Sequence, residues 1–307
     1  MKILVTGGAG FIGSNIVDRY LELGHDVSIL DNLSTGKKDN INPKAKFYQV
    51  DLLDPNLHQV FDEGKFDIVS HHAAQIDVRK SVEDPAYDAN INIVGGLKLL
   101  QECVKHNIKK FIFASTGGAI YGEKNKFPVN EQGVMEPLSS YGVAKRSIEL
   151  YLGVYKEVYG LRFTVLRYGN VFGPRQNPKG EAGVNAIFIG KMLNNEPIII
   201  NGDGNQERDY VYVGDVVAAN ALAIDKGLWE AYNVGTGIGI SVNQIFTDLK
   251  GIIGYKLAPN YGPAKKGEIY KIYLDAGKIK QDLGWKPAMP FKDGLQKTVE
   301  WYKSATF

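Results

Sequence analysis

The segment TGGAGFIG, residues 6–13, restricts the possible folds of this chain more than any other stretch. It directly follows the apolar run ILV, which indicates a short buried strand. Gly7, Gly10 and Gly13 permit a tight turn from strand into helix and close approach of the backbone to a pyrophosphate. The pyrophosphate would lie at the positive end of the helix dipole. The spacing therefore predicts a strand–turn–helix unit that binds a dinucleotide.

Short apolar runs alternate with helix-like segments throughout the first half of the chain. In the first such segment Ile12, Ile16, Tyr20 and Leu23 lie on one helical face, and Gly24 ends the helix. Runs that are apolar throughout and separated by helices are typical of a parallel sheet covered on both faces. We expect strands at residues 2–7, 26–31, 46–51, 66–74, 109–115 and 162–170.

The rhythm loosens after about residue 170, where Gly, Pro and Asn become frequent and the elements shorter. The sequence therefore predicts an α/β protein with a doubly wound, parallel-sheet Rossmann domain over residues 1–169 and a smaller C-terminal α/β domain over 170–307. The segment RDYVYVGDVVAANALAI resembles a strand that feeds a helix. We expect the chain to return to the first domain there, around residues 208–235.

An acidic residue follows the glycine loop at the distance that a dinucleotide fold requires. Asp31 ends the second strand, 18 residues after Gly13, where its carboxylate can accept bonds from the adenine ribose hydroxyls. A carboxylate there repels a 2′-phosphate, and the next residues are Asn32 and Leu33 rather than arginine. NAD is therefore the expected cofactor, in preference to NADP. Asp51, after the third strand, is expected at the adenine edge.

The segment YGVAK places Tyr141 and Lys145 on one face of a helix that begins after a pair of serines. A second copy, YGPAK at Tyr261, contains Pro263 and does not favour a helix. A tyrosine with a pKa near 10 is a poor base at neutral pH. We expect the ammonium of Lys145 and a cationic nicotinamide to lower that pKa, so that the phenolate takes a proton from a sugar hydroxyl.

Composition narrows the possible partners and location. The formal net charge is only +2, which gives no indication of a nucleic acid or a membrane surface as partner. The single cysteine, Cys103, is expected on a buried helix and suits a reducing compartment. The N-terminus has no signal-peptide core, and a cytoplasmic protein is expected. His71 and His72 are adjacent on a strand and point to opposite faces, so no metal site is expected.

These elements together resemble the extended short-chain dehydrogenases/reductases of the NAD-dependent epimerase/dehydratase family, and most of all its UDP-glucose 4-epimerase branch. The resemblance covers nearly the whole chain and implies a UDP-sugar substrate, an active site between the two domains, and a homodimer. It is carried by TGGAGFIG, DNLSTG, HHAAQIDVRKSVEDP, ASTGGAIYG, YGVAK, LRYGNVFGPRQ, GEAGV, QERDYVYVGDV and LGWKP.

The resemblance also implies roles for single residues. Thr116 falls on the catalytic hydroxyl, Tyr141 on the base, and Lys145 on the lysine that binds ribose and tunes the tyrosine. Asn170 and Arg208 fall where the family grips the UDP diphosphate. The implied cofactor contacts are Phe11 and Ile12 at the pyrophosphate, Asp31, Asn32, Ser34 and Gly36 at the adenosine, Asp51 and Leu52 at the adenine, and Ala73, Ala74 and Gln75 along the cleft.

The chain departs from the family pattern at several positions. Thr116 stands where serine is common, and Gly96 where threonine is usual. Lys265 replaces the arginine of an Arg-x-Gly-Asp motif, and a lysine cannot bind phosphate bidentately. Ile272 falls on the position that walls the hexose pocket, where a tyrosine is associated with excluding N-acetylated sugars. Isoleucine there implies mainly UDP-glucose and UDP-galactose as substrates, with slower conversion of the N-acetyl pair.

The loop after Thr116 carries no carboxylate. Related 4,6-dehydratases and UDP-glucuronate decarboxylases have an acid in this loop, whereas this chain has Gly117 and Gly118. The protein is therefore expected to oxidise the 4-hydroxyl and return hydride to the other face, which is a 4-epimerisation. UDP-N-acetylglucosamine and UDP-glucuronate 4-epimerases, a dehydratase, a decarboxylase or a reductase remain as alternatives, together with a non-enzymatic NAD sensor.

Overall fold

The computed structural model describes residues 1–178, 183–264 and 269–304. Its largest sheet is parallel throughout and has the order β10-β6-β5-β4-β1-β2-β3. This is the predicted doubly wound α/β fold. The strands are β1 (Lys2–Thr6), β2 (Asp26–Leu30), β3 (Lys46–Tyr48), β4 (Ile68–His71), β5 (Lys110–Thr116), β6 (Phe163–Tyr168) and β10 (Glu230–Val234).

The strand order reverses between β1 and β4, which are neighbours although β2 and β3 separate them in the chain. Thr6 is in register with His71 at the carboxyl ends of these two strands. The loops that follow them therefore leave the sheet in opposite directions and open a crevice. In folds of this kind the crevice at the reversal is where ligands bind.

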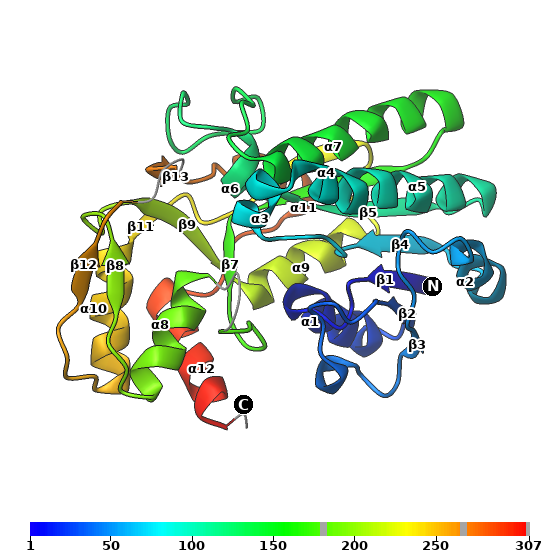
Figure 1. The fold of residues 1–307 in the computed structure, drawn as a ribbon. Helices are drawn as coiled ribbons and strands as arrows, with labels where there is room; N and C mark the ends of the chain where they lie inside the picture. Colours follow the sequence, from blue (N-terminus) through cyan, green and yellow to red (C-terminus); the bar gives the residue numbers. More distant parts are fainter. Residues whose placement is uncertain (179–182, 265–268, 305–307) are drawn as a thin grey trace.

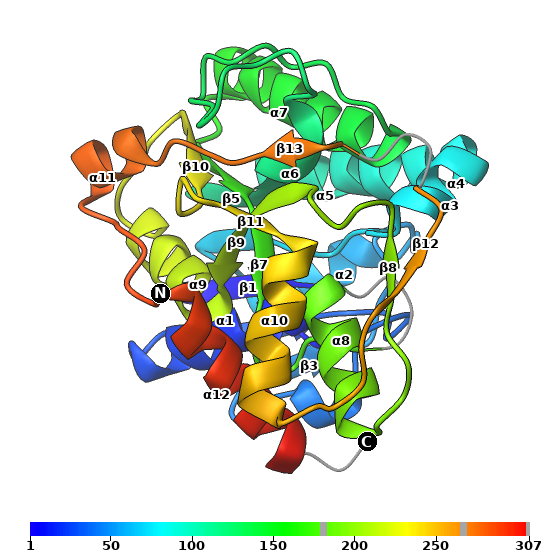
Figure 2. The same ribbon diagram turned by 90° about the vertical axis from the view of Figure 1, so that its left-hand side faces the viewer.

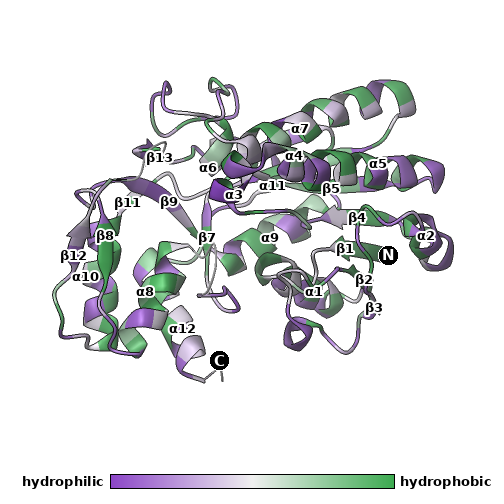
Figure 3. Ribbon diagram, viewed as in Figure 1, coloured by the Kyte–Doolittle hydropathy of each residue, from purple (hydrophilic) through white to green (hydrophobic). Residues whose placement is uncertain are grey.

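Helices cover both faces of this sheet (Figure 1). One face carries α1 (Phe11–Glu22), α9 (Val213–Ala223) and α11 (Gly277–Leu283), which share a buried cluster with β1 and β2. The other carries α2 (Leu57–Gly64), α5 (Gly95–Lys105) and α7 (Ser140–Tyr159), packed against β4 to β6. The strands between these layers are mainly hydrophobic (Figure 3), because both of their faces are buried.

The first helix follows its predicted pattern except at its end. Ile16 and Tyr20 are buried, but Leu23 is exposed because it caps the helix after Glu22. Gly24, with φ +79°, ends the helix as predicted. Cys103 lies buried on α5, also as predicted.

A second, smaller sheet places β9 (Glu207–Tyr212) beside β7 (Asn170–Phe172), β11 (Gly239–Ser241) and β13 (Lys271–Ile272). A two-stranded sheet pairs β8 (Ile199–Asn201) with β12 (Asn260–Gly262). The helices α8 (Val184–Leu193), α10 (Val242–Ile253) and α12 (Phe291–Ser304) pack together beside them (Figure 2).

The chain is expected to return to the first domain around residues 208–235. Within that range β9 belongs to the second sheet. In the same range α9 packs on α1, and β10 pairs with β6 in the first sheet.

Short elements complete the part of the chain around the crevice: η1 (Lys38–Asn40), α3 (Val78–Glu83), α4 (Pro85–Ala89), a single π turn η2 (Asn90–Val94) and α6 (Gly117–Ile120). Within the described ranges, no helix is long and apolar enough to cross a membrane.

Candidate active site

The glycine loop has the geometry of a phosphate-binding turn. Gly7 has φ +69°, and a Cβ on it would lie 2.6 Å from the backbone nitrogen of Ala73. A Cβ on Gly13 would lie 2.2 Å from the carbonyl oxygen of Gly7. No side chain caps the start of α1 at Gly10, and the first turn of the helix carries no acidic residue. The loop therefore fits a pyrophosphate.

The predicted adenosine-binding residues converge beside this loop. The carboxylate of Asp31 accepts hydrogen bonds from the backbone of Ala9 (3.0 Å) and Leu33 (2.8 Å). A Cβ on Gly36 would lie 2.8 Å from the same carboxylate, so a larger residue there would displace Asp31. Asn32 donates to Asp51 at 2.6 Å. The turn that carries Asp31 is thereby joined to Asp51 after the third strand.

Ser34 and Leu52, which the sequence also predicts at the adenosine, lie in the neighbouring turns. The backbone nitrogen of Ser34 donates to the Asn32 side chain at 2.9 Å. Leu52 is buried below Gly95 on α5. The structure brings these residues together at one end of the crevice, which suits an adenosine.

The loop after β4 crosses the glycine loop and is held by two residues that the sequence did not single out. Thr6 accepts a hydrogen bond from the backbone of Ala73 at 3.2 Å, which fixes the start of the segment containing Ala74. Asn92 accepts from the backbone nitrogen of Gln75 and donates to its carbonyl oxygen, both at 2.9 Å. The Gln75 side chain donates to Asp88 at 2.8 Å.

Tyr141 and Lys145 lie in the first turns of α7, as predicted. Ser139 caps the helix by accepting from the backbone of Gly142, and the Tyr141 nitrogen donates to the buried hydroxyl of Ser81 at 3.1 Å. The Lys145 ammonium donates to the carbonyl oxygen of Ala114 at 2.9 Å. Its Nζ lies 5.8 Å from the centre of the Tyr141 ring. The pair is therefore anchored to both α3 and β5.

The electrostatics of this pair differ from the prediction. Burial lowers the pKa of Lys145 to about 8, although Asp88 and Glu149 oppose the fall. Burial also raises the pKa of Tyr141, and the negative charge of Asp88 adds to the rise. The lowering expected from Lys145 together with a cationic nicotinamide is therefore not found in the protein alone.

Of the two hydroxyls at the end of β5, only one is available for chemistry. Ser115 is buried and donates to Glu149 at 2.6 Å. Thr116, the next residue, points to the other face because side chains alternate along a strand. A Cβ on Gly118 would lie 3.8 Å from the Thr116 hydroxyl and 3.4 Å from the amide oxygen of Asn170. Thr116, Gly118 and Asn170 therefore meet at one place.

The two glycines after Thr116 are not equivalent. A Cβ on Gly117 would lie 2.4 Å from the side chain of Leu274, so any side chain at 117 meets the core. A Cβ on Gly118 would make only ordinary contacts, with Thr116 and Asn170. An acid that acted on a substrate beside Thr116 would have to stand at 118, and this chain has glycine there.

A buried ion-pair network centred on Glu149 lies next to Ser115 and Lys145. Arg167 on β6 donates two hydrogen bonds to Glu149 on α7, at 3.0 and 2.7 Å. Arg167 also donates to the hydroxyl of Tyr121 at 2.8 Å, and Tyr121 donates to Asn233 on β10. The network joins α7 to β6 and β10. Glu149 was not singled out from the sequence. It lies one helical turn beyond Lys145, and this i, i+4 spacing could have indicated it.

The remaining substrate-side residues lie on the second sheet. Asn170 begins β7, and Arg208 lies on β9, where its guanidinium donates to the carbonyl oxygens of Glu207 and Tyr270. Ile272 is in register with Arg208 on β13. It is only 1% exposed and packs with Ile120, Tyr121, Val129 and Leu274. Its role as a pocket wall stays a prediction, and Lys265 lies outside the described residues.

Other sequence features have structural explanations. His71 bonds the hydroxyl of Thr6 at 2.7 Å and His72 that of Ser70 at 2.8 Å. Tyr261 lies exposed on β12 rather than on a helix, as predicted. A Cβ on Gly96 would lie 2.8 Å from the side chain of Ile148, which fills the space that a threonine would take.

Burial, followed by the charge of Lys145, lowers the pKa of His71 and His72, for His72 to about 3. Both imidazoles are therefore neutral. Among the described residues, no cluster of His, Cys, Asp or Glu could hold a metal ion.

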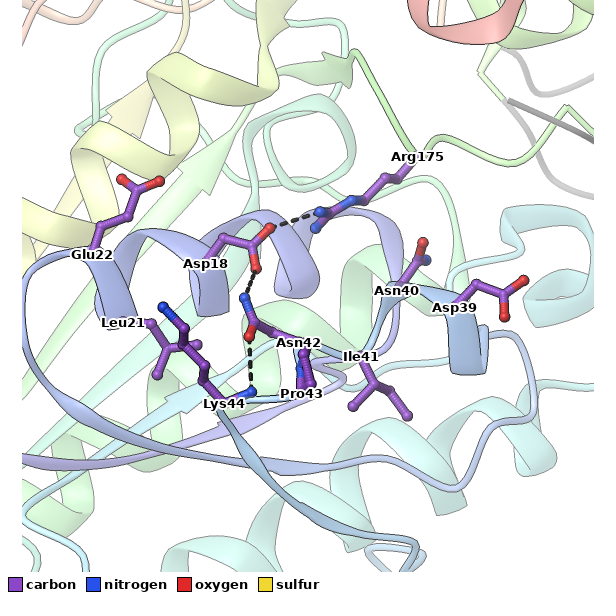
Figure 4. Close-up of a pocket in the computed structure, with 10 residues that line it drawn as sticks. All are labelled: Asp18, Leu21, Glu22, Asp39, Asn40, Ile41, Asn42, Pro43, Lys44 and Arg175. Atoms are coloured by element: carbon purple, nitrogen blue, oxygen red, sulfur yellow. Dashed lines mark hydrogen bonds and ion pairs between the residues drawn. The ribbon is translucent and has the colours of Figure 1, made fainter. Parts of the chain in front are cut away.

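A separate hollow of about 370 Å³ lies at the far end of α1 (Figure 4). Arg175 forms an ion pair with Asp18 at 2.7 Å, and Asn42 donates to the other oxygen of Asp18. These contacts tie the loop after β7 to α1. The hollow contains none of the predicted site residues and mixes both charges, so it is not the candidate active site.

The protein combines a crevice at the reversal of the sheet, a helix start without a side-chain cap, and a tyrosine–lysine pair next to the end of β5. These features place it among the dinucleotide-binding α/β enzymes. The sequence profile of the NAD dependent epimerase/dehydratase family matches residues 3–235, and the chain belongs to this family.

Individual relatives agree with this assignment. A Methanocaldococcus jannaschii protein named putative UDP-glucose 4-epimerase is 50% identical over 304 residues, covering 98% of each chain. The structure of a UDP-glucose 4-epimerase with UDP-glucose from Thermotoga maritima is 51% identical, with a TM-score of 0.98 over 99% of each chain. That of a UDP-glucose 4-epimerase complex with NAD from Thermus thermophilus is 43% identical, with a TM-score of 0.94 over 100% of each chain.

Proposed function

We infer that the protein is a nucleotide-sugar 4-epimerase, an isomerase that interconverts UDP-glucose and UDP-galactose with bound NAD. The observation that carries this function is the tyrosine–lysine pair, with 5.8 Å from Lys145 Nζ to the Tyr141 ring centre, whose lysine is bonded to the strand that ends at Thr116, where the following loop has no carboxylate. The full-length similarity to UDP-glucose 4-epimerases supports the same substrate pair.

The glycine loop and the acids at residues 31 and 51 fit NAD, as described above. NAD, when bound, accepts a hydride from carbon 4 of the sugar and returns it. Tyr141 takes the proton of the 4-hydroxyl and gives it back, while Thr116 hydrogen-bonds the 4-oxygen. Lys145, held at the end of β5 by the Ala114 carbonyl, keeps a positive charge close to Tyr141. That charge favours the phenolate when the crevice is filled.

Epimerisation requires that the 4-keto sugar present its other face before hydride returns. We propose that Asn170 and Arg208 hold the UDP diphosphate during this rotation, which leaves the sugar free to turn. Asn170 is well placed, because its amide oxygen lies 3.4 Å from the Cβ position of Gly118, next to Thr116. Under this proposal residues 1–169 bind NAD and residues 170–307 bind the nucleotide sugar.

The dehydratase alternative is not favoured by the loop after Thr116. Elimination of water from neighbouring carbons needs an acid or base beyond the tyrosine. A side chain at position 117 would have to displace that of Leu274, and both positions 117 and 118 are glycine. The chain can therefore oxidise and reduce carbon 4 without a group that drives elimination.

We also propose that the protein forms a homodimer through α7. Val143, Leu150, Val154 and Val158 are exposed at spacings of seven, four and four, which places them along one side of the helix. A stripe of this kind on the outside of a helix is typical of a helix-to-helix interface. A cytoplasmic location is proposed as well, since the one cysteine is buried and nucleotide sugars are the expected substrates.

The function is tested by incubating the purified protein with UDP-glucose, UDP-galactose, their N-acetyl counterparts and UDP-glucuronate separately, and separating the products by anion-exchange chromatography. We expect interconversion of the first two sugars without added NAD. A 4-keto-6-deoxy product, or loss of the carboxyl group of UDP-glucuronate, would contradict the proposal.

A further inference from the structure

One buried acid in the first domain has no role in the mechanism above. Asp88, on α4, is only 1% exposed, and its second carboxylate oxygen, Oδ2, is buried without a hydrogen-bond partner among the described residues. A buried carboxylate oxygen without a hydrogen-bond partner lowers the stability of the fold. Such a group in a native structure therefore calls for a structural or functional explanation. Its surroundings point to the active site rather than to the core.

The bonded oxygen of Asp88 completes a clamp on the cofactor loop. Oδ1 accepts from the side chain of Gln75 at 2.8 Å and from that of Asn92 at 3.0 Å. Asn92 in turn holds the backbone of Gln75 at both its nitrogen and its oxygen. Three polar side chains from α4, the π turn and the loop after β4 thus close one hydrogen-bonded unit. A π turn in a helix is often found at functional sites.

The charge of Asp88 acts on the catalytic pair. It raises the pKa of Tyr141, after burial, and it opposes the burial-driven fall in the pKa of Lys145. Burial raises the pKa of Asp88 itself, while the bonds from Gln75 and Asn92 and the charge of Lys145 oppose the rise.

The other ionisable groups around Asp88 are accounted for. On α7, Glu149 also acts on Lys145 but is occupied by Arg167. His71, which ends β4, and His72, directly after it, have pKa values lowered by burial and are neutral. On α3, Arg79, Lys80 and Glu83 are exposed, and Lys80 stacks on the ring of Tyr87 at the surface. The π turn carries no ionisable residue.

We propose that Asp88 is a positioning residue of the epimerase: the oxygen that accepts from Gln75 and Asn92 fixes Gln75 in the cofactor cleft. The inference rests on the proposed function only in that the cleft holds NAD, and it applies to any NAD-binding role of the chain.

The test compares two variants that differ in whether they keep the hydrogen-bond acceptor. Asp88→Asn keeps an oxygen to accept from Gln75 and Asn92 but removes the charge. Asp88→Leu removes both. The matched control is Asp84→Asn, an exposed acid that caps the same short helix by accepting from the backbone of Tyr87, because asparagine caps a helix as well as aspartate.

Two quantities are measured for each protein: NAD affinity by calorimetry on cofactor-depleted enzyme, and kcat against pH for UDP-galactose. For Asp88→Asn we expect NAD affinity within about three-fold of wild type, since the clamp remains. Without the negative charge both Tyr141 and Lys145 lose their protons more readily, so both limbs of the pH profile move to lower pH. We expect a shift of about 0.5 to 1 pH unit, below that of a directly contacting charge.

For Asp88→Leu we expect NAD binding weakened by about ten-fold or more, because Gln75 and Asn92 lose their shared acceptor. Asp84→Asn should match wild type in both measurements. An Asp88→Asn profile that does not move along the pH axis would show that the charge of Asp88 does not act on the catalytic pair. Wild-type NAD affinity in folded Asp88→Leu would overturn the clamp. A wild-type enzyme inactive on every UDP-sugar would instead refute the proposed function, while the NAD affinities would still decide the clamp.

Discussion

The buried pair of Glu149 and Arg167 gives the most quantitative prediction about stability. Their side chains are only 3% and 4% exposed. The Glu149 carboxylate accepts two bonds from Arg167, one from Ser115 and one from Arg146. Glu149→Ala removes all four and leaves the guanidinium of Arg167 buried without a counter-charge.

The size of the effect follows from this geometry. Removing one member of a buried pair typically costs about 3–5 kcal/mol, because the remaining charge stays desolvated. We expect Glu149→Ala to lower the free energy of unfolding by about that amount. The double variant Glu149→Leu/Arg167→Met should cost clearly less than the sum of the two single changes, since no unpaired charge is left.

The assay is urea unfolding followed by circular dichroism, with NAD saturating for every protein because bound ligand adds to stability. The control is Glu157→Ala on the same helix, where Glu157 is 75% exposed and pairs with Lys156 at 3.3 Å. An exposed pair of this kind contributes about 0–1 kcal/mol. If Glu149→Ala were within about 1 kcal/mol of wild type, the pair would not hold α7 on β6, and our account of the network would be wrong.

Three further predictions concern the chemistry. Tyr141→Phe should lower kcat by about 10²–10⁴-fold with little change in UDP-sugar affinity, whereas Tyr261→Phe should leave kcat intact; equal kcat for Tyr141→Phe and wild type would mean that another group is the base. Gly117→Ala should lower the thermal unfolding midpoint, because its Cβ would meet the core. Gly118→Ala should leave the unfolding midpoint unchanged and raise KM for UDP-glucose. If Gly118→Ala lowered the midpoint and Gly117→Ala did not, the assignment of position 118 to the site would be refuted. Ile272→Tyr should lower kcat/KM for the N-acetylated sugars more than for UDP-glucose, by about 1–3 kcal/mol in discrimination. Equal losses of kcat/KM for both sugar pairs would show that this buried residue does not set the choice between them.

The features that depend on local spacing were predictable from the sequence. The glycine loop, Asp31 and the Tyr141–Lys145 pair each need only one turn, one strand end or one helix face, and each lies where the spacing indicated. The parallel sheet also followed from its continuous apolar strands. Glu149 was within reach of the same reasoning, as a residue one turn beyond Lys145.

The features that depend on tertiary placement were not predictable. Asp88 and Asn92 act on Gln75 only because a π turn and the reversal of the sheet bring three separate segments together. The raised pKa of Tyr141 has the same origin, since its causes are burial and an acid on another helix. The alternation along β5 required one of Ser115 and Thr116 to face inward, but which one is decided by Glu149 across the interface.

In the proposed reaction one bound NAD takes hydride from carbon 4 and returns it to the same sugar. This is measured by turnover of UDP-galactose deuterated at carbon 4, with excess unlabelled NADH in solution and product analysis by mass spectrometry and NMR. We expect UDP-glucose that retains deuterium at carbon 4, with no deuterium in the free cofactor and no net change in NADH. Loss of the label from carbon 4, or its transfer to the dissolved cofactor, would contradict the proposed reaction.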